Sequence, residues 1–303
     1  MMKRLKLHVP AFINVAPPLA LLLAATPGWF GHIKYATPIV HPDDHKDLAR
    51  QAVEYLVKSK AIASESLLVR RKADIESGCG MLDIVEGDAG RDPGTLQWEY
   101  SHVFDPVAGR GINDSRYVNA RDEFVDWWER ALMHDRIGNP AKAYTFLGYC
   151  CHLLQDMAVP SHTFCISHGL RTRMADNLEL VSRSRRFHLR EPAGPPYRGE
   201  EDMHLSIFMA LAIESRGLDE DGGPNELAEV LARYYQPPLW TQGGWIGSYL
   251  GEPYYPYHRF LPSSPRLDLV DAVTLRNSLM CSAAERTAQL VRHFSDVTGA
   301  EKR

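Results

Sequence analysis

The sequence predicts an all-α protein in which several helices are joined by long loops. Apolar residues recur at the three- and four-residue spacing of an amphipathic helix in successive segments of the chain. The segments between them are rich in Gly, Pro and Asp and lack this period. The sequence shows no internal repeat, no heptad pattern and no series of β-hairpins, so a helical fold is favoured.

Length and charge narrow the class of protein. The 303 residues can bury a large core as one big domain or as two modest ones. The formal net charge of -4 argues against a general polyanion binder, so nucleic acid is not an expected partner. Beyond the N-terminal region, no apolar run approaches the roughly 20 residues of a transmembrane helix.

The N-terminus has the pattern of a secretory signal peptide. Basic side chains come first, at Lys3, Arg4 and Lys6. A short run rich in Leu and Ala follows at residues 16–25, too short to span a bilayer. We therefore expect residues 1–28 to be a signal peptide and residues 29–303 to form a single mature domain, secreted or periplasmic. A start-site artefact or a buried N-terminal helix is the alternative.

The five cysteines are an odd number for an exported chain, so at least one thiol stays outside any disulfide. Cys150 and Cys151 are adjacent on a predicted helix, so we expect that they do not both face inward. None of the five has zinc-finger spacing. We expect the cysteines to serve as small apolar residues in the core, with at most one disulfide among them.

The first predicted helix follows Asp43 and Asp44, which are placed to cap its start. Its apolar face is formed by Leu48, Ala49, Ala52, Val53, Leu56 and Val57. His45 lies in the first turn, from where its side chain can leave the packed face and reach an ion. A capping or surface histidine is the alternative interpretation.

From Ser77 to Gly111 the sequence predicts a long loop, because this stretch is rich in Gly, Asp and Pro and has no helical period. Loops of this length in compact proteins usually carry function or are disordered. This loop carries Asp88 and His102. Aromatic side chains are placed to anchor it, namely Trp98, Tyr100 and Phe104.

A pair of helices follows this loop. Apolar residues at helical spacing mark the first one: Phe124, Trp127, Trp128, Ala131 and Leu132. Gly138-Asn139-Pro140 separates it from the second, whose apolar stripe consists of Phe146, Leu147, Leu153 and Leu154. The second helix is therefore expected to be buried.

Three metal-competent side chains lie within eleven residues at the end of this second helix. His152 and Asp156 are four residues apart, so they share one helix face. Pro160 ends the helix and turns the chain at Val159, so that His162 can return to the same space. The alternative is a core histidine that is hydrogen-bonded to the aspartate four residues on.

The remaining chain predicts more helices and two irregular stretches. Residues 183–200 are basic and then rich in Gly and Pro, which predicts a loop insertion. Helices are expected at residues 201–216, 225–235 and 267–297. Residues 236–266 hold many prolines, glycines and aromatic residues, which favours an irregular loop packed by its own aromatic rings; a lipid-contacting surface is the alternative.

Four separated segments, within roughly residues 29–181, form a combined pattern. The buried helix and its turn contribute Leu147, Gly148, His152, Asp156, Pro160 and His162. The second segment is Ser101-His102-Val103-Phe104-Asp105-Pro106, with Asp88 fourteen residues before its histidine. The others are His45 followed by Ala52, and Trp29. Together they resemble the zinc-dependent phospholipase C family, which shares its fold with the fungal single-strand-specific zinc nucleases.

The resemblance implies a multi-helix fold with long loops around a site of two to three zinc ions. One zinc would be held by Asp88, His102, His152 and Asp156. Asp156 would bridge to a second zinc, which His45 and the amino nitrogen and carbonyl of Trp29 would complete. Signal-peptide cleavage would then have to leave Trp29 first; otherwise water, His32 or His41 would take its place.

The third zinc would be held by His162, a second histidine and a carboxylate. The family's best-known His-x3-Glu pair is absent after His162. The resemblance therefore implies His168 with Asp176, and Glu179 is the reserve carboxylate.

Histidine and carboxylate ligands suit catalytic rather than structural zinc. Two neighbouring zinc ions can share a water, lower its pKa and stabilise in-line attack at phosphorus, and Asp88 could take the proton. The resemblance implies a phospholipase C that cleaves a phospholipid to diacylglycerol and a phosphorylated head group, with transient contact with a membrane surface. The alternatives are a nuclease of the same fold that acts on single-stranded nucleic acid, and a zinc-binding protein without turnover.

Overall fold

The computed structural model describes residues 42–88, 101–112, 119–166, 202–241, 244–249, 252–253 and 269–300. All of them belong to the unit Thr37–Arg303. The predicted signal peptide, Trp29 and the predicted loop at 183–200 lie outside the described residues. No helix among the described residues is both long and apolar enough to cross a membrane.

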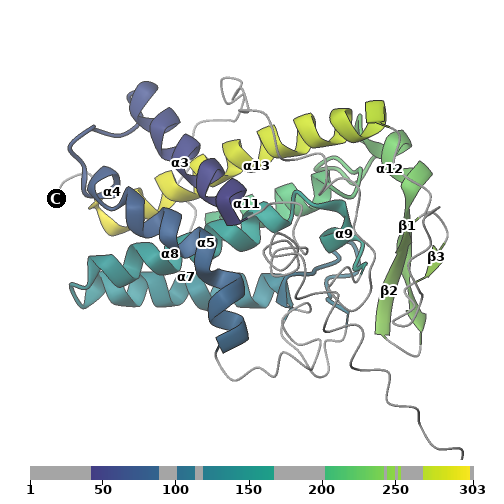
Figure 1. Ribbon diagram of the computed structural model, residues 1–303, viewed down its shortest axis with the longest axis horizontal. Coiled ribbons are helices and arrows are strands. Elements are labelled where there is room, and N and C mark those ends of the chain that lie inside the picture. The colour runs from purple at the N-terminus through teal and green to yellow at the C-terminus, as the bar shows by residue number, and fades with distance from the viewer. Residues whose placement is uncertain are drawn as a thin grey trace, which may run out of the picture. The chain divides into compact units, whose positions relative to one another are not determined.

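The described chain is mostly helical, which confirms the all-α class (Figure 1). The helices are α3 (Pro42–Lys58), α4 (Leu67–Arg70), α5 (Lys72–Asp88), α7 (Ala120–Arg136), α8 (Pro140–Asp156), α9 (Pro160–Thr163), α11 (Met203–Glu214), α12 (Ala228–Tyr234) and α13 (Leu269–Thr298). Every helix that the sequence predicted is present. A small antiparallel sheet accompanies them, in the order β1 (Tyr235–Thr241), β2 (Gly244–Tyr249) and β3 (Glu252–Pro253).

Helix α8 is the centre of the helical part, with α5, α7, α13 and α3 packed around it (Figure 1). Asn139 caps its first turn by accepting from the backbone N–H of Lys142, and Pro140 occupies the first helical position. Every residue from Leu147 to Asp156 is buried. The expectation that Cys150 and Cys151 do not both face inward is therefore wrong, because this part of α8 is covered on all sides.

Glycines let α5 and α8 touch at their backbones. A Cβ on Gly78 would overlap the carbonyl oxygen of Thr145, and a Cβ on Gly148 would overlap that of Ile75. Across this contact, the thiol of Cys79 donates to the carbonyl of Gly148 at 3.2 Å. The close approach brings the backbone of α5 within reach of side chains on α8.

The end of α8 agrees with the predicted turn. The helix ends at Asp156, and Val159 is extended, with φ -100° and ψ 111°, as a residue before proline should be. Pro160 then starts the short helix α9 rather than only stopping α8. His162 lies on α9 and is buried.

Two predicted loops are partly wrong. The stretch from Ser77 continues α5 as far as Asp88, because Gly78 serves helix packing and not a turn. In the predicted loop at 236–266, strands β1 and β2 pair as a hairpin. Consecutive prolines at 237–238 argued against a strand, but a shift in register between Gln236 and Leu239 accommodates them.

All five cysteines are thiols and none forms a disulfide. Four of them are buried, at Cys79, Cys150, Cys151 and Cys165. This agrees with the prediction that the cysteines serve as small apolar residues. The single disulfide that the sequence allowed does not form.

Candidate metal centre

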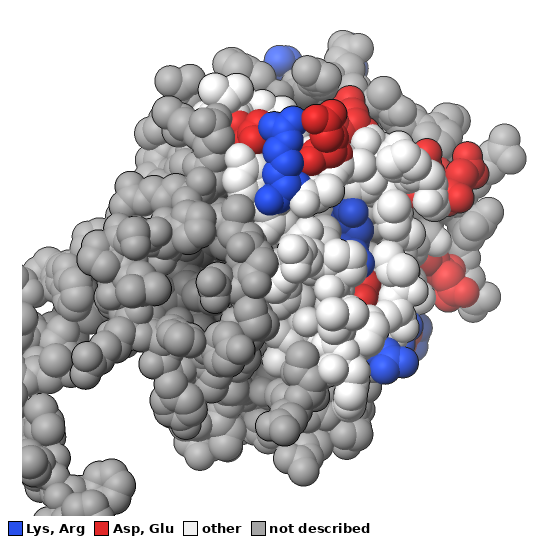
Figure 2. Space-filling view, turned by 90° about the vertical axis from the view of Figure 1, so that its right-hand side faces the viewer, with Lys and Arg blue, Asp and Glu red and all other residues white. Residues whose placement is uncertain are grey.

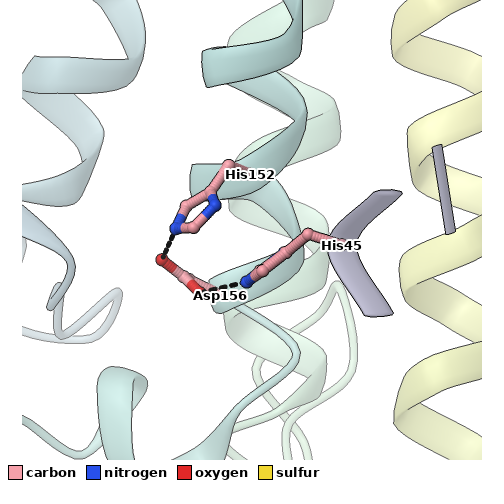
Figure 3. A group of neighbouring side chains, drawn as sticks. All are labelled: His45, His152 and Asp156. Carbon is pink, nitrogen blue, oxygen red and sulfur yellow. Dashed lines mark ion pairs between the residues drawn. The ribbon is translucent and has the colours of Figure 1, made fainter. Parts of the chain in front are cut away.

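Three buried side chains from two helices meet beside the end of α8 (Figure 3). His45 comes from the first turn of α3, and His152 and Asp156 come from successive turns of α8. Each offers one ligand atom, and these atoms lie within 4.8 Å of one another. The rings of His45 and His152 stack, with centroids 3.9 Å apart.

The tautomer of His45 follows from its neighbours. Its Nδ1 lies 2.7 Å from Oε1 of Gln155, and because an amide oxygen can only accept, Nδ1 carries the proton. Nε2 therefore carries the lone pair and lies 3.5 Å from Oδ1 of Asp156. The ring is fully buried, so His45 is not a surface residue.

His152 has the same tautomer for a similar reason. Its Nδ1 donates to the backbone carbonyl of Cys79 on α5 at 2.7 Å. Nε2 lies 3.4 Å from Oδ2 of Asp156, and in the neutral ring it carries the lone pair. A neutral His152 in this tautomer cannot donate a hydrogen bond to Asp156, which argues against the alternative of a core histidine bonded to the aspartate four residues on.

Two further histidines extend the cluster. His102 lies 2.6 Å from Oδ2 of Asp156 through its Nδ1. His162 donates from Nδ1 to the backbone carbonyl of His102 at 2.6 Å. In return, the backbone N–H of Phe104 donates to the carbonyl of His162 at 3.1 Å. These bonds fix the segment that carries His102 against α9.

The hairpin β1–β2 also supports this segment. The indole Nε1 of Trp245 on β2 donates to Oδ2 of Asp105 at 2.8 Å. The backbone N–H of Trp245 donates to the carbonyl of Ile112, also at 2.8 Å. His102 therefore lies on a segment that is hydrogen-bonded to both α9 and the hairpin, which limits how far it can move from Asp156.

The carboxyl of Asp156 is buried yet ionised. Burial by itself raises its pKa, but the surrounding imidazoles outweigh burial and hold that pKa well below its ordinary value. These imidazoles belong to His152, His162 and His102. Burial, together with the neighbouring His152, also lowers the pKa of His45 well below its ordinary value, so this ring is neutral.

This arrangement fits a metal ion. His45 Nε2 and Asp156 Oδ1 are buried and face each other at 3.5 Å, and neither has a hydrogen-bond partner among the residues that the structure describes. Both are acceptors, so no hydrogen bond can join them, and two orphaned acceptors side by side are costly. A shared cation satisfies both. Two ligands about 2.1 Å from a tetrahedral ion lie about 3.4 Å apart, close to the separation seen here.

The structure brings together five of the predicted ligands, listed by element as His45 on α3, His152 and Asp156 on α8, His102, and His162 on α9. Asp88 is the last residue of α5, and its side chain is not among those described. Trp29, His168, Asp176 and Glu179 lie outside the described residues.

Two partners of the histidines were not predicted from the sequence. The carbonyl of Cys79 gives no sequence signal, because every residue has one. Gln155 does give a signal, since it is a polar residue directly before Asp156 on an otherwise apolar helix. A buried glutamine at that place needs partners on both ends of its amide.

Comparison with known proteins shows a likeness in fold. No protein-family model matches the sequence, and no curated protein matches it. A matching solved structure is the alpha-toxin of Clostridium perfringens from avian strain SWCP, with 11% sequence identity and a TM-score of 0.51, covering 88% of this chain and 65% of that one. Another is the alpha toxin of Clostridium absonum, with 12% identity and a TM-score of 0.48, covering 87% and 64%. This chain thus spans just under two thirds of their length.

Proposed function

We propose that this protein, which has the zinc phospholipase C fold that the resemblance predicted, is a zinc-dependent phosphodiesterase that cleaves phospholipids to diacylglycerol and a phosphorylated head group. The observation that carries the proposal is the pair of facing, buried acceptors, His45 Nε2 and Asp156 Oδ1. Nothing in the core of an ordinary helical bundle requires such a pair. A cation-binding centre does.

The two oxygens of Asp156 support its proposed role as a bridge. Oδ1 faces His45, whereas Oδ2 faces His152 and His102. This division is the one that a carboxylate shared by two ions requires. We assign Trp29 to the His45 ion and Asp88 to the other. For a third ion we assign His162, His168 and Asp176, with Glu179 as the alternative carboxylate.

The chain's own groups prepare the site for phosphodiester hydrolysis. When bound, zinc supplies Lewis-acid stabilisation of charge on the phosphoryl group and acidifies water. Asp156 is ionised and offsets the charge of bound cations. The hydrogen bonds from Nδ1 of His45 and His152 fix the directions of their lone pairs. We assign to Asp88 the role of accepting a proton from the attacking water.

The hairpin is the surface that we propose touches lipid transiently. Leu239 and Trp240 on β1 are large apolar side chains that are 71% and 66% exposed. Figure 2 views the side of the molecule that carries the strands; white, uncharged residues make up much of the described surface there, with acidic and basic residues among them. Tryptophan is favoured at a membrane–water interface because its ring is amphipathic. The same hairpin holds the segment that carries His102, so lipid contact would occur near the proposed centre.

Vesicle binding tests the hairpin. Replacement of both Leu239 and Trp240 by serine should weaken binding to phosphatidylcholine vesicles about tenfold or more, because two exposed apolar side chains are lost. The matched control is Ile137→Ser, which removes a similarly exposed apolar side chain at the end of α7. Equal binding by both variants would refute this surface.

Substrate class is tested directly. The purified chain, with and without a chelator, is assayed against phosphatidylcholine micelles and against single-stranded RNA. We expect the phosphorylated head group to be released from phosphatidylcholine, and we expect the chelator to abolish this release. Cleavage of RNA alone would favour the nuclease of the same fold. Zinc binding without turnover of either substrate would favour a non-catalytic zinc protein.

A further inference from the structure

A series of buried hydrogen bonds joins the candidate metal centre to the C-terminal helix. The side-chain oxygen of Gln155 accepts the proton of His45 Nδ1 at 2.7 Å. The amide nitrogen of Gln155 donates to Oγ1 of Thr287 on α13 at 3.3 Å. The hydroxyl of Thr287 donates to the carbonyl of Ala283, one turn earlier on α13, at 2.7 Å. His45, Gln155 and Thr287 are all fully buried.

The donor and acceptor roles in this series of hydrogen bonds are set at α13. A backbone carbonyl can only accept, so the Thr287 hydroxyl gives its proton to Ala283 and presents its oxygen to Gln155. The amide of Gln155 must then turn its nitrogen to Thr287 and its oxygen to His45. The result is a proton on Nδ1 of His45 and a lone pair on Nε2, the atom that faces Asp156.

His45 and His152 differ in how their tautomers are held. His152 donates to the carbonyl of Cys79, which cannot reverse its role. His45 donates to an amide, which can flip and offer N–H in place of oxygen. A flipped Gln155 would move the proton of His45 to Nε2 and close that atom to a cation. The flip requires the Thr287 hydroxyl to leave Ala283, so Thr287 opposes it.

We infer that Gln155 and Thr287 are positioning residues that hold His45 ready to bind a metal ion before the ion arrives. Helix α13 thereby controls a ligand on α3 without contacting the ion. The inference rests on the proposed metal binding but not on phospholipid as the substrate. Loss of such outer partners typically weakens metal binding about 10- to 100-fold.

The test uses the full mature chain with Thr287→Val, which removes the hydroxyl and keeps the shape, and Thr287→Ser, which keeps the hydroxyl. Zinc affinity is measured by competition with a chelating dye. We expect about 10-fold or greater loss for Thr287→Val and a change of less than about 3-fold for Thr287→Ser. Equal affinity of Thr287→Val and the unaltered chain would overturn the inference, and so would equal losses in both variants.

A second readout does not need bound zinc or activity. Long-range ¹H–¹⁵N spectra of the zinc-free protein with labelled histidine report which ring nitrogen carries the proton, and the His45 signal is assigned with His45→Gln. We expect the proton on Nδ1 in the unaltered chain and a second tautomer in Thr287→Val. A proton on Nε2 in the unaltered chain would overturn the inference even if Thr287→Val fails to fold. Failure of the unaltered chain to bind zinc would instead refute the proposed function.

Discussion

Asp156 should be the residue whose replacement has the largest effect, because both of its oxygens face histidines of the cluster. We expect Asp156→Asn to abolish phosphodiesterase activity and to remove bound zinc. In the presence of excess zinc, the free energy of unfolding should fall by about 2–4 kcal/mol, since ion binding no longer stabilises the folded state. Activity, zinc content and urea denaturation measure these changes.

The control for Asp156→Asn is Asp126→Asn, the same chemical change at an aspartate that is half exposed on α7 and paired with Arg130. Its effect on stability should stay within about 0.5 kcal/mol, because exposed ion pairs contribute little. Retained activity in Asp156→Asn would remove the basis of the proposed function.

A second residue-scale prediction concerns His293 on α13, whose ring stacks on Trp128 with centroids 5.2 Å apart. Burial and the neighbouring His204 lower the pKa of His293 from 6.5 to about 4. The unfolded chain therefore takes up a proton near pH 6.5, whereas the folded chain does so only near pH 4. The contribution of His293 to the free energy of unfolding is therefore fully present above about pH 6.5. It is lost as the pH falls towards 4, by at most about 3 kcal/mol.

The variant His293→Gln cannot titrate, so its stability should fall less steeply between pH 6.5 and pH 4 than that of the unaltered chain. Urea denaturation of the zinc-free proteins at several pH values in that range makes the comparison. Equal slopes would show that His293 is not the group responsible.

At this scale, the sequence identified side chains but not their partners. His45, His152 and Asp156 could be found because metal-competent residues stand out in apolar segments at helical spacing. The carbonyl of Cys79 and the hydroxyl of Thr287 could not, since their roles depend on how α5 and α13 pack on α8. The sequence shows which side chains can bind a metal. It does not show hydrogen-bond partners that lie 73 residues apart, as His152 and Cys79 do, or 132 residues apart, as Gln155 and Thr287 do, because these depend on the fold.

At the scale of elements, the crossing of α5 and α8 gives a sharp prediction. Gly78→Ala should destabilise the protein by about 1–3 kcal/mol, because the added Cβ would overlap the backbone of Thr145 and push the helices apart. It should also weaken zinc binding, since the carbonyl of Cys79 would move away from His152. Denaturation with and without zinc separates the two effects.

Gly80→Ala is the matched control in the same helix. A Cβ there would meet only the flexible side chain of Lys46, which can move aside. Alanine also has a higher helix propensity than glycine, by up to about 1 kcal/mol. Gly80→Ala should therefore be neutral or stabilising, and a loss equal to that of Gly78→Ala would refute the close-contact explanation.

Helix α5 also shows why some boundaries were predicted wrongly. The glycines from Ser77 onward predict a loop, although Gly78 lies in a helix interior against another backbone. Helices α7, α8 and α13 were predicted well because long apolar periodicity is a strong signal. The hairpin was missed because its consecutive prolines lie at an irregular register, which only strand pairing reveals.

At the scale of the whole molecule, we predict that the mature protein begins at Trp29. An α-amino group can bind zinc only when it is free and neutral, so a residue retained before Trp29 would block it. N-terminal sequencing of the exported protein should start at Trp29, and its zinc content should be two to three per chain. A chain that keeps Gly28 should lose one zinc and most activity.

Full activity in a protein that begins elsewhere would show that Trp29 is not a ligand. A zinc ratio of one or less would contradict the multinuclear site as a whole. In the first case, His45 would share its ion with water or with a different side chain, such as His32 or His41.

The link from α3 through Gln155 to α13 also sets an order of events during synthesis. Gln155 follows His45 by 110 residues, and Thr287 follows Gln155 by another 132. At about 5–20 residues per second, the ribosome makes Thr287 roughly 10–50 s after His45. Until α13 docks beside α3 and α8, the amide of Gln155 is free to flip. If Gln155 and Thr287 preset His45 as inferred above, a chain whose α13 has not yet docked lacks a preset cation site, so we expect capture of the ion to follow the docking of the C-terminal helix.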